Sequence, residues 1–353
     1  MGRAATLRLG LLGAGFIGTV HARCIAENRR VTLAQVFDVD RAAAEAVAAL
    51  CGAAVAETIE DLISDPGIDA LLVASSTDTH GAIARAAIAQ GKAFLCEKPL
   101  DLTLAAASET VNRAQTAGIL AGMAFNRRFD LQHAFLRSAV AEGAVGNIEM
   151  MHLTSRSQSP PDLEYARRSG GMLRDKGAHF FDLACWIAQD RPVKVYAQGA
   201  CLFEPRLAEY GDVDTAMIVL EMSRGALCHM NFSRRTNYGY DERIEVFGSL
   251  GRIESGTPMP LEIATYRGTT VTRPGLHQTW FERMAPTYAA QLSAFVEEID
   301  TRNGTFPTVR DGLLAEVIAD AAQRSMDMGL PVEIAFDSIA GRQDQRAAKP
   351  RLE

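Results

Sequence analysis

Residues 9–22 read LGLLGAGFIGTVHA, and this stretch decides the fold of the N-terminal part of the chain. Gly13, Gly15 and Gly18 stand in G-x-G-x-x-G spacing between an apolar run typical of a buried strand and the start of a helical pattern. In such a turn the first glycine permits a tight bend, the second lets the backbone approach a diphosphate, and the third lets helix and strand pack closely. The amides that open the helix then face the anion. We therefore predict a dinucleotide site at this turn.

Asp38 follows the next apolar run, 20 residues after Gly18 (38 − 18). A carboxylate at the end of the second strand accepts hydrogen bonds from the ribose hydroxyls of NAD and repels the extra phosphate of NADP. We therefore expect NAD as the cofactor, although Arg41 nearby leaves some tolerance of NADP open. The alternative is a plain glycine turn in which Asp38 caps the following helix. The strand, turn and helix context favours the nucleotide site.

Short apolar runs alternate with longer, alanine-rich amphipathic ones from residue 7 to about residue 124. The short runs cover 7–12, 31–37, 70–74, 93–96 and 120–125, and the long runs cover 17–28, 41–51, 79–90 and 103–117. Strand and helix repeated in this order require right-handed crossovers and a parallel sheet covered on both faces. The pattern predicts a doubly wound Rossmann domain over residues 1–124.

The pattern changes after residue 125. A helix is expected at 131–142 and β-rich runs at 148–154, 193–200, 216–222, 226–232, 243–247 and 261–266. The links at 223–225 and 248–251 are short and contain glycine, as hairpins require. Further helices are expected at 172–188, 286–301 and 312–328. We predict an α+β domain over residues 125–353 with a large, mostly antiparallel open-faced sheet that serves substrate binding and oligomerisation, and a tail or subunit-contact arm at 341–353.

Composition excludes several classes of protein. The chain of 353 residues is 48% hydrophobic, 22% charged and 7% aromatic, with a formal net charge of −7. A negative chain with few aromatic side chains fits neither nucleic acid nor an anionic membrane surface, and no run reaches the roughly 18 apolar residues of a membrane span. The six cysteines lie far apart and the glycines at 13–18 argue against a secretion signal. We expect a cytoplasmic protein that binds a small molecule.

Lys98 follows the strand expected at 93–96, in the segment CEKPL. Loops at the carboxyl ends of parallel strands line the ligand crevice, so Lys98 is expected beside the nucleotide. The alternative is a surface lysine paired with Glu97.

A second cluster, SGGMLRDKGAHFFDLACWIA, places Asp175, His179 and Asp182 on one stripe of the helix expected after Gly170 and Gly171. A histidine flanked by carboxylates is suited to general acid-base chemistry. The alternatives are a core histidine satisfied by Asp175, or a metal site, which lacks a fourth ligand nearby. We expect no metal.

These motifs together carry a resemblance. GAGFIG at 13–18, EKP at 97–99 and GG…DKGAHFFD at 170–182 resemble the glucose-fructose oxidoreductase/inositol dehydrogenase/MocA family of NAD(P)-dependent dehydrogenases. AFNRRFD at 124–130, GDVDTA at 211–216 and the segment 233–251 resemble the bacterial inositol 2-dehydrogenases of that family. The resemblance runs in order from Leu7 to about Leu330.

The resemblance implies site residues in both domains. It makes Lys98, Asp175 and His179 the catalytic residues, and it implies that these three bind substrate together with Asn126, Arg127, Tyr238 and Tyr240. The cofactor-binding residues that it implies are Gly13, Gly15, Phe16, Ile17, Gly18, Asp38, Ser75, Thr77, His80, Glu97 and Lys98. It also implies a homotetramer joined through the antiparallel sheets and a cis peptide at Lys98-Pro99.

The implied activity is NAD-dependent oxidation of a ring hydroxyl of a cyclic polyol, myo-inositol first, with His179, oriented by Asp175, as general base. The chain departs from the inositol dehydrogenases at Gly177, Ala178 and Phe180, where they carry bulkier residues and a carboxylate. We expect Gly177 to thin the substrate side of the helix. Dehydrogenation of scyllo-inositol or of another polyol or aldose therefore stays open. So does an NAD-sensing protein without catalysis.

Overall fold

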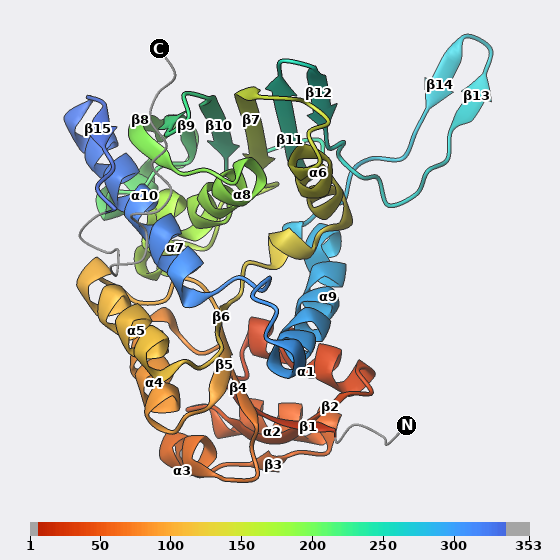
Figure 1. Cartoon of the computed structure of the whole chain (residues 1–353). Helices are drawn as coiled ribbons and strands as arrows, with labels where there is room; N and C mark the ends of the chain where they lie inside the picture. The colour runs from red at the N-terminus through yellow and green to blue at the C-terminus, as the bar shows by residue number, and fades with distance from the viewer. Residues whose placement is uncertain (1–5, 337–353) are drawn as a thin grey trace.

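The computed structural model describes residues 6–336. Its first sheet has six parallel strands in the order β3-β2-β1-β4-β5-β6, as Figure 1 shows in the lower part of the molecule. The strands are β1 (Leu7–Leu12), β2 (Val31–Phe37), β3 (Ala54–Val55), β4 (Ala70–Val73), β5 (Ala93–Cys96) and β6 (Ala121–Met123). All four residues of β4 and of β5 are buried, as expected for strands covered on both faces. The predicted Rossmann architecture is confirmed.

Helices connect these strands. They are α1 (Phe16–Glu27), α2 (Arg41–Cys51), α3 (Ile59–Ser64), α4 (Thr77–Ala89) and α5 (Leu104–Ala117). The side chain of Asp40 caps the start of α2, and Gly52, in the left-handed region at φ 67°, ends it. These two signals explain why α2 has the predicted bounds. Strand β3 and helix α3 were not predicted, because two and six residues are too short to show a period.

The second sheet has seven strands in the order β12-β11-β7-β10-β9-β8-β15. They are β7 (Ile148–Arg156), β8 (Pro192–Ala200), β9 (Thr215–Met222), β10 (Leu227–Ser233), β11 (Asp241–Gly248), β12 (Gly251–Glu254) and β15 (Val332–Glu333). Only the β7–β10 pair is parallel among these described pairs, so the predicted mostly antiparallel sheet is confirmed. Buried and exposed residues alternate along β9, which is typical of a sheet with one covered face.

Helices and short turns complete the second half. They are η1 (Asn126–Phe129), α6 (Leu131–Ala141), α7 (Leu163–Arg168), the π-helix η2 (Leu173–Gly177), α8 (Ala178–Ala188), η3 (Pro205–Tyr210), α9 (Trp280–Thr301) and α10 (Val309–Met328). Helix α9 begins six residues before its predicted start at Pro286, because Thr279 caps it and the proline lies inside the helix. No helix within residues 6–336 is long and apolar enough to cross a membrane.

The strand predicted at 261–266 is wrong. Residues 261–264 form no strand, and β13 (Thr265–Arg267) pairs with β14 (Thr270–Thr272) in a hairpin that projects from the body (Figure 1). Leu261, Ile263 and Tyr266 are exposed there, so their apolar character does not reflect a core position. The predicted tail at 341–353 lies outside the described residues.

Helix α9 returns to the first sheet. Leu292, Phe295 and Val296 of α9, with Phe306 after it, belong to the same buried cluster as residues of β1, β2 and α1. Gly122 and Thr308 form an isolated bridge between the two halves. A boundary at residue 124 stays a prediction, and the core of the N-terminal domain includes side chains from far along the chain.

Candidate active site

The glycine turn between β1 and α1 has the geometry of a diphosphate site. Gly13 has a φ of 101°, and a Cβ on it would overlap the carbonyl of Ala74 after β4. A Cβ on Gly18 would overlap the carbonyl of Gly13, whereas one on Gly15 would meet nothing within 4 Å. Gly15 is the N-cap of α1, and no side chain caps that helix. The turn therefore exposes a bare helix start with open space beside it, which fits an anion.

Asp38 lies against this turn. Its Oδ2 accepts a hydrogen bond from the amide of Ala14 at 2.6 Å, and its Oδ1 accepts one from the amide of Asp40 at 2.8 Å. The side chain that caps α2 belongs to Asp40, so the alternative role for Asp38 as a helix cap does not hold. Asp38 is half-buried beside the turn, where a ribose would lie next to a bound diphosphate.

The other residues implied for the cofactor lie around the same edge of the sheet. Phe16, at the start of α1, is 61% exposed and contacts the rings of Trp280 and Phe281. Ile17 is half-buried one residue later, and Thr77 opens α4. These positions stay predictions for cofactor contact.

His80 joins two loops. Its Nδ1 lies 2.7 Å from the carbonyl oxygen of Pro99, and its Nε2 lies 3.0 Å from that of Ser75. The imidazole is buried between them. The hydroxyl of Ser75 shares a hydrogen bond of 2.6 Å with that of Thr79. His80 thus braces the loop after β4 against the loop that carries Lys98, and its ring nitrogens face backbone carbonyls.

Lys98 reaches across to the second domain. Its Nζ donates to Asp175 Oδ1 at 2.7 Å and to the carbonyl of Asp175 at 2.9 Å. Glu97 instead lies 3.0 Å from His21 Nε2 on α1, so a Glu97–Lys98 surface pair does not form. The Lys98-Pro99 peptide is cis, as the resemblance implied.

Asp175 lies in the π-helix η2 that precedes α8. Gly170 and Gly171, at φ 78° and 80°, turn the chain into it, as the sequence predicted. Asp175 Oδ1 also accepts a hydrogen bond of 2.9 Å from the hydroxyl of Tyr165, a residue on α7 that sequence reasoning missed. Burial raises the pKa of Asp175, but the Lys98 ammonium and the Tyr165 hydroxyl outweigh burial and lower it. Asp175 is therefore an ionised partner of Lys98.

His179 has no hydrogen-bond partner among residues 6–336. Its Nδ1 is buried without a partner, and its ring lies edge-on to Phe125 at 5.9 Å. The expectation that Asp175 orients His179 is wrong, because a π-helix has a wider turn than an α-helix and Asp175 faces Lys98. Burial, followed by the charges of Arg127 and Lys98, holds the pKa of His179 well below its ordinary value. The imidazole is neutral and free to accept a proton.

Asp182 does not flank His179 either. Its two carboxylate oxygens accept hydrogen bonds from Arg128 at 2.9 and 2.5 Å, in a buried pair. Gly177 faces the core, since a Cβ on it would lie 3.0 Å from the ring of Phe181. The expectation that Gly177 thins the substrate side of the helix is therefore wrong.

The four residues implied for substrate binding beside the catalytic three have polar partners within the protein. Asn126 Nδ2 donates to Thr287 Oγ1 at 2.9 Å. Arg127 donates to Glu242 at 3.1 Å and to the hydroxyl of Tyr240 at 3.1 Å, and all three side chains are buried. Tyr238 is 46% exposed, with its hydroxyl 2.9 Å from Asp241 Oδ2. The structure thus brings Lys98 and Asp175 into contact, and Lys98 lies near enough for its charge to add to burial in lowering the pKa of His179. Contact of the four other residues with substrate stays a prediction.

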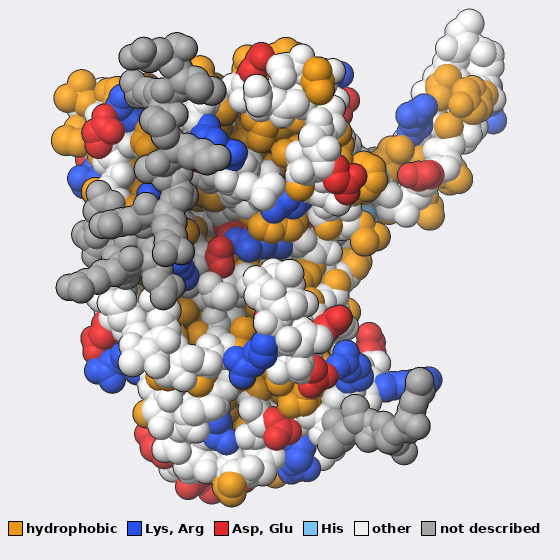
Figure 2. All heavy atoms as spheres, in the orientation of Figure 1, with side chains coloured by type: hydrophobic (Ala, Val, Ile, Leu, Met, Phe, Trp, Pro, Cys, Tyr) orange, Lys and Arg blue, Asp and Glu red, His pale blue; other side chains and the backbone are white. Residues whose placement is uncertain are grey.

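Figure 2 shows a small group of basic and acidic side chains exposed between the upper and lower parts of the molecule. No group of His, Cys, Asp or Glu within residues 6–336 is arranged to hold a metal ion. What the site offers is a cation held by a carboxylate, a neutral imidazole with a partnerless nitrogen, and an uncapped glycine turn. These groups fit a bound dinucleotide beside a small alcohol from which a proton is removed.

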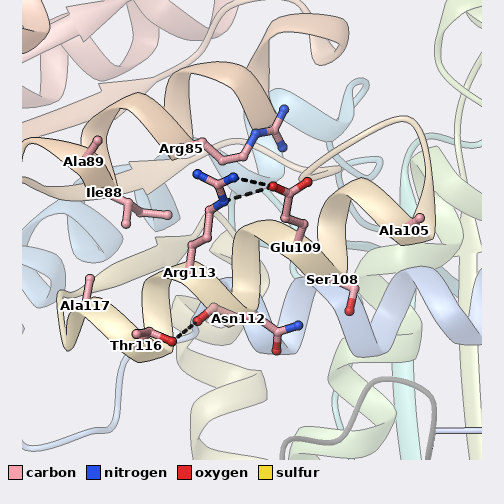
Figure 3. A pocket seen from close by; sticks show the side chains of 10 residues that line it. All are labelled: Arg85, Ile88, Ala89, Ala105, Ser108, Glu109, Asn112, Arg113, Thr116 and Ala117. Carbon is pink, nitrogen blue, oxygen red and sulfur yellow. Dashed lines mark hydrogen bonds and ion pairs between the residues drawn. The ribbon is translucent and has the colours of Figure 1, made fainter.

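A cavity of about 630 Å³ lies elsewhere, between α4 and α5 on the outer face of the first domain. Figure 3 shows that Glu109 and Arg113 bond to each other beside it, while the aliphatic side chain of Ile88 and several alanines line its wall. None of the predicted site residues lines this cavity, so it is separate from the chemistry described above.

Two family models match the chain. Residues 7–125 match an oxidoreductase family with an NAD-binding Rossmann fold, and residues 133–254 match the GFO/IDH/MocA C-terminal domain. The inositol 2-dehydrogenase of Rhizobium meliloti (strain 1021) is 38% identical over 332 residues, 94% of this chain and 100% of the relative. The scyllo-inositol 2-dehydrogenase (NAD(+)) of Bacillus subtilis (strain 168) is 30% identical, over 93% of this chain and 96% of the relative.

Solved structures agree with these matches. The crystal structure of a putative myo-inositol dehydrogenase from Sinorhizobium meliloti 1021 superposes with a TM-score of 0.89 at 37% identity, and the match covers 94% of this chain and 100% of that one. The glycine turn and the lysine loop lie in the first matched region, and His179 lies in the second. The chain therefore belongs to the GFO/IDH/MocA family of oxidoreductases, with an NAD-binding Rossmann domain at its N-terminus.

Proposed function

We propose that this protein oxidises a ring hydroxyl of a cyclic polyol with NAD as the hydride acceptor, and that myo-inositol is its substrate. The observation that carries the proposal is the meeting of Lys98 from the first domain with Asp175 from the second, close in sequence to a neutral, partnerless His179. The likeness to inositol dehydrogenases of known substrate supports the choice of polyol.

The mechanism follows from the charges of these groups. NAD, when bound, accepts the hydride that leaves the substrate carbon. His179 accepts the hydroxyl proton, because its lowered pKa keeps it neutral at pH 7. Lys98 donates a hydrogen bond to the same oxygen and stabilises the negative charge that develops there. Asp175 holds the Lys98 ammonium in place through the 2.7 Å contact.

The experiment is a kinetic comparison of variants. The purified protein is incubated with NAD and with myo-inositol, scyllo-inositol and a panel of other polyols and aldoses, and the reduced nicotinamide is followed by absorbance. His179→Ala and Lys98→Met are each expected to lower kcat by about 10²- to 10⁴-fold, the range of general acid-base and electrostatic contributions. The exposed Arg113→Met serves as the control variant.

Three results of this experiment would change or refute parts of the proposal. A higher kcat/KM for scyllo-inositol or an aldose would replace myo-inositol and leave the reaction type in place. Folded His179→Ala protein with the parental rate would refute the role of His179. Tight NAD binding without turnover of any polyol or aldose would refute the enzymatic proposal and favour an NAD-sensing protein.

We also propose that the protein forms a homotetramer through the outer face of its second sheet. Large apolar side chains are exposed on neighbouring strands of this face: Met150, Tyr196, Met217, Val219, Leu227 and Phe247. An apolar patch of this kind favours association with another protein surface. Light scattering of the wild-type protein and of a Met217→Asp variant tests the proposal. A monomeric wild-type protein would refute it.

The six free cysteines support the expected cytoplasmic location.

A further inference from the structure

Lys176 is a second lysine at the site that the proposed mechanism does not use. It follows Asp175 in η2 and lies three residues before His179. Its Nζ donates to Ser157 Oγ at 2.6 Å and to the carbonyl of Ser233 at 3.2 Å. These acceptors stand at the carboxyl ends of β7 and β10, the parallel pair of the second sheet. The side chain as a whole is only partly exposed to solvent.

The charges around Lys176 do not balance. The three other cations in its neighbourhood each pair with one carboxylate: Lys98 with Asp175 at 2.7 Å, Arg127 with Glu242 at 3.1 Å, and Arg234 with Asp212 at 2.5 Å. No ion pair formed within residues 6–336 includes Lys176. The cluster therefore carries one positive charge in excess whenever Lys176 is protonated.

This excess charge is costly without an anion. Burial, followed by the charges of Arg127 and Arg234, lowers the pKa of Lys176 to about 7, and Glu242 and Asp175 oppose the shift only in part. An anion placed against Nζ would favour the ammonium form. Two of the three ammonium hydrogens have protein acceptors, which leaves one for a ligand.

We infer that Lys176 contacts the substrate and that it favours cyclic polyols carrying a carboxylate, such as sugar uronic acids, over their neutral counterparts. One unpaired cation matches a singly charged carboxylate rather than a doubly charged phosphate. The inference rests on the proposed function, because the reacting hydroxyl is still served by Lys98 and His179. Within the polyols and aldoses that the proposed reaction could accept, it predicts a higher kcat/KM for those with an acidic substituent.

The test compares matched substrates on the NAD-loaded enzyme. D-Glucuronate is compared with D-glucose, and D-galacturonate with D-galactose, because the members of each pair share a ring and differ in the carboxylate. The ratio of their kcat/KM values is measured in wild-type, Lys176→Met and Lys176→Arg proteins. This ratio does not depend on how much of a variant is active. Arg113→Met, which removes an exposed positive charge on α5, is the control.

The wild-type protein is expected to prefer at least one uronate over its neutral partner. Lys176→Met should lower that ratio by about tenfold or more, the effect of losing one hydrogen bond to a charged group. Lys176→Arg should retain most of the ratio and Arg113→Met all of it. A wild-type preference for the neutral sugar in both pairs, or an unchanged ratio in Lys176→Met, would overturn the inference.

The pH dependence gives a second readout. Only the ammonium form pairs with a carboxylate, so kcat/KM for the uronate should fall as the pH rises through about 7, while kcat/KM for the neutral sugar should not. Lys176→Met should lack this fall. Calorimetric titration with each uronate separates the two proposals. Uronate binding that depends on Lys176 without any turnover would refute the proposed reaction alone, whereas turnover of myo-inositol with uronate binding independent of Lys176 would refute this inference alone.

Discussion

Asp175→Asn should weaken catalysis because it disturbs Lys98, and it should leave the proposed base, His179, unchanged. The carboxylate of Asp175 accepts hydrogen bonds from Lys98 at 2.7 Å and from Tyr165 at 2.9 Å, and none from His179. The substitution keeps the shape of the side chain and removes its charge. Lys98 then loses the ion pair that holds it in place.

The size of the effect follows from this contact. A hydrogen bond to a charged group contributes about 1.5–3 kcal/mol. The side chains of Lys98 and Asp175 are 16% and 21% exposed, so solvent screens the pair in part and the lower end of this range applies. A loss of about 1.5–2 kcal/mol corresponds to a decrease of roughly 10- to 30-fold in kcat/KM.

The assay is a double-mutant cycle. The kcat/KM for the polyol is measured in the wild-type, Asp175→Asn, Lys98→Met and doubly substituted proteins, each across the pH range. If Asp175 acts through Lys98, Asp175→Asn should add little to the loss already caused by Lys98→Met. A full 10- to 30-fold further loss in that background would refute the reasoning. A shift of the acid limb of the pH profile in Asp175→Asn would do so too, because it would place Asp175 on His179.

Three further outcomes are expected. Because the pKa of His179 lies well below 6.5, kcat/KM for a neutral polyol should stay level as the pH is lowered to 6.5, and a profile that already falls at pH 7 would contradict the neutral base. Gly13→Ala should destabilise the protein by about 1–3 kcal/mol in thermal unfolding because Gly13 has a φ of 101°. Gly15→Ala should leave the melting temperature within a degree or two and weaken NAD binding measured by fluorescence. The reverse pattern would contradict the turn geometry. Asp212→Asn leaves the buried Arg234 charge without a partner and should lower the free energy of unfolding in urea by about 3–5 kcal/mol, and a loss below about 1 kcal/mol would show that the pair is screened.

Hydrophobic periodicity was sufficient for most of the fold because the burial pattern in these segments is simple. The run 41–51 has the helical period and is bounded by Asp40 and Gly52, so its bounds were predicted correctly. The same reasoning failed at 261–266, where the apolar residues are exposed in and just before the projecting hairpin. It placed the start of α9 at Pro286, whereas the capping hydroxyl of Thr279 opens the helix. Hydrophobic periodicity shows how apolar residues are spaced along the chain. It does not show whether those residues lie in a core or on an exposed arm.

The sequence singled out candidate site residues but not their contacts. Lys98 was singled out because it follows a strand of a nucleotide domain, Asp175 and His179 because they fall on one helix stripe, and the resemblance implied that all three are catalytic. The partner of each was not predicted, because it depends on local geometry: η2 is a π-helix, and this turns Asp175 toward Lys98 and Tyr165. Tyr165 stands in a short helix without any motif, so no signal in the sequence pointed to it.

The return of α9 to the first sheet has a consequence for biosynthesis. Phe295 and Phe306 complete the apolar core that begins with Leu9 and Leu11, almost 300 residues earlier in the chain. Contacts of such long range form slowly, and a ribosome releases the N-terminal end long before these partners are made. The nucleotide domain is translated first and is completed among the last parts of the protein. A gene fragment that ends at residue 124 should therefore yield an incompletely packed product.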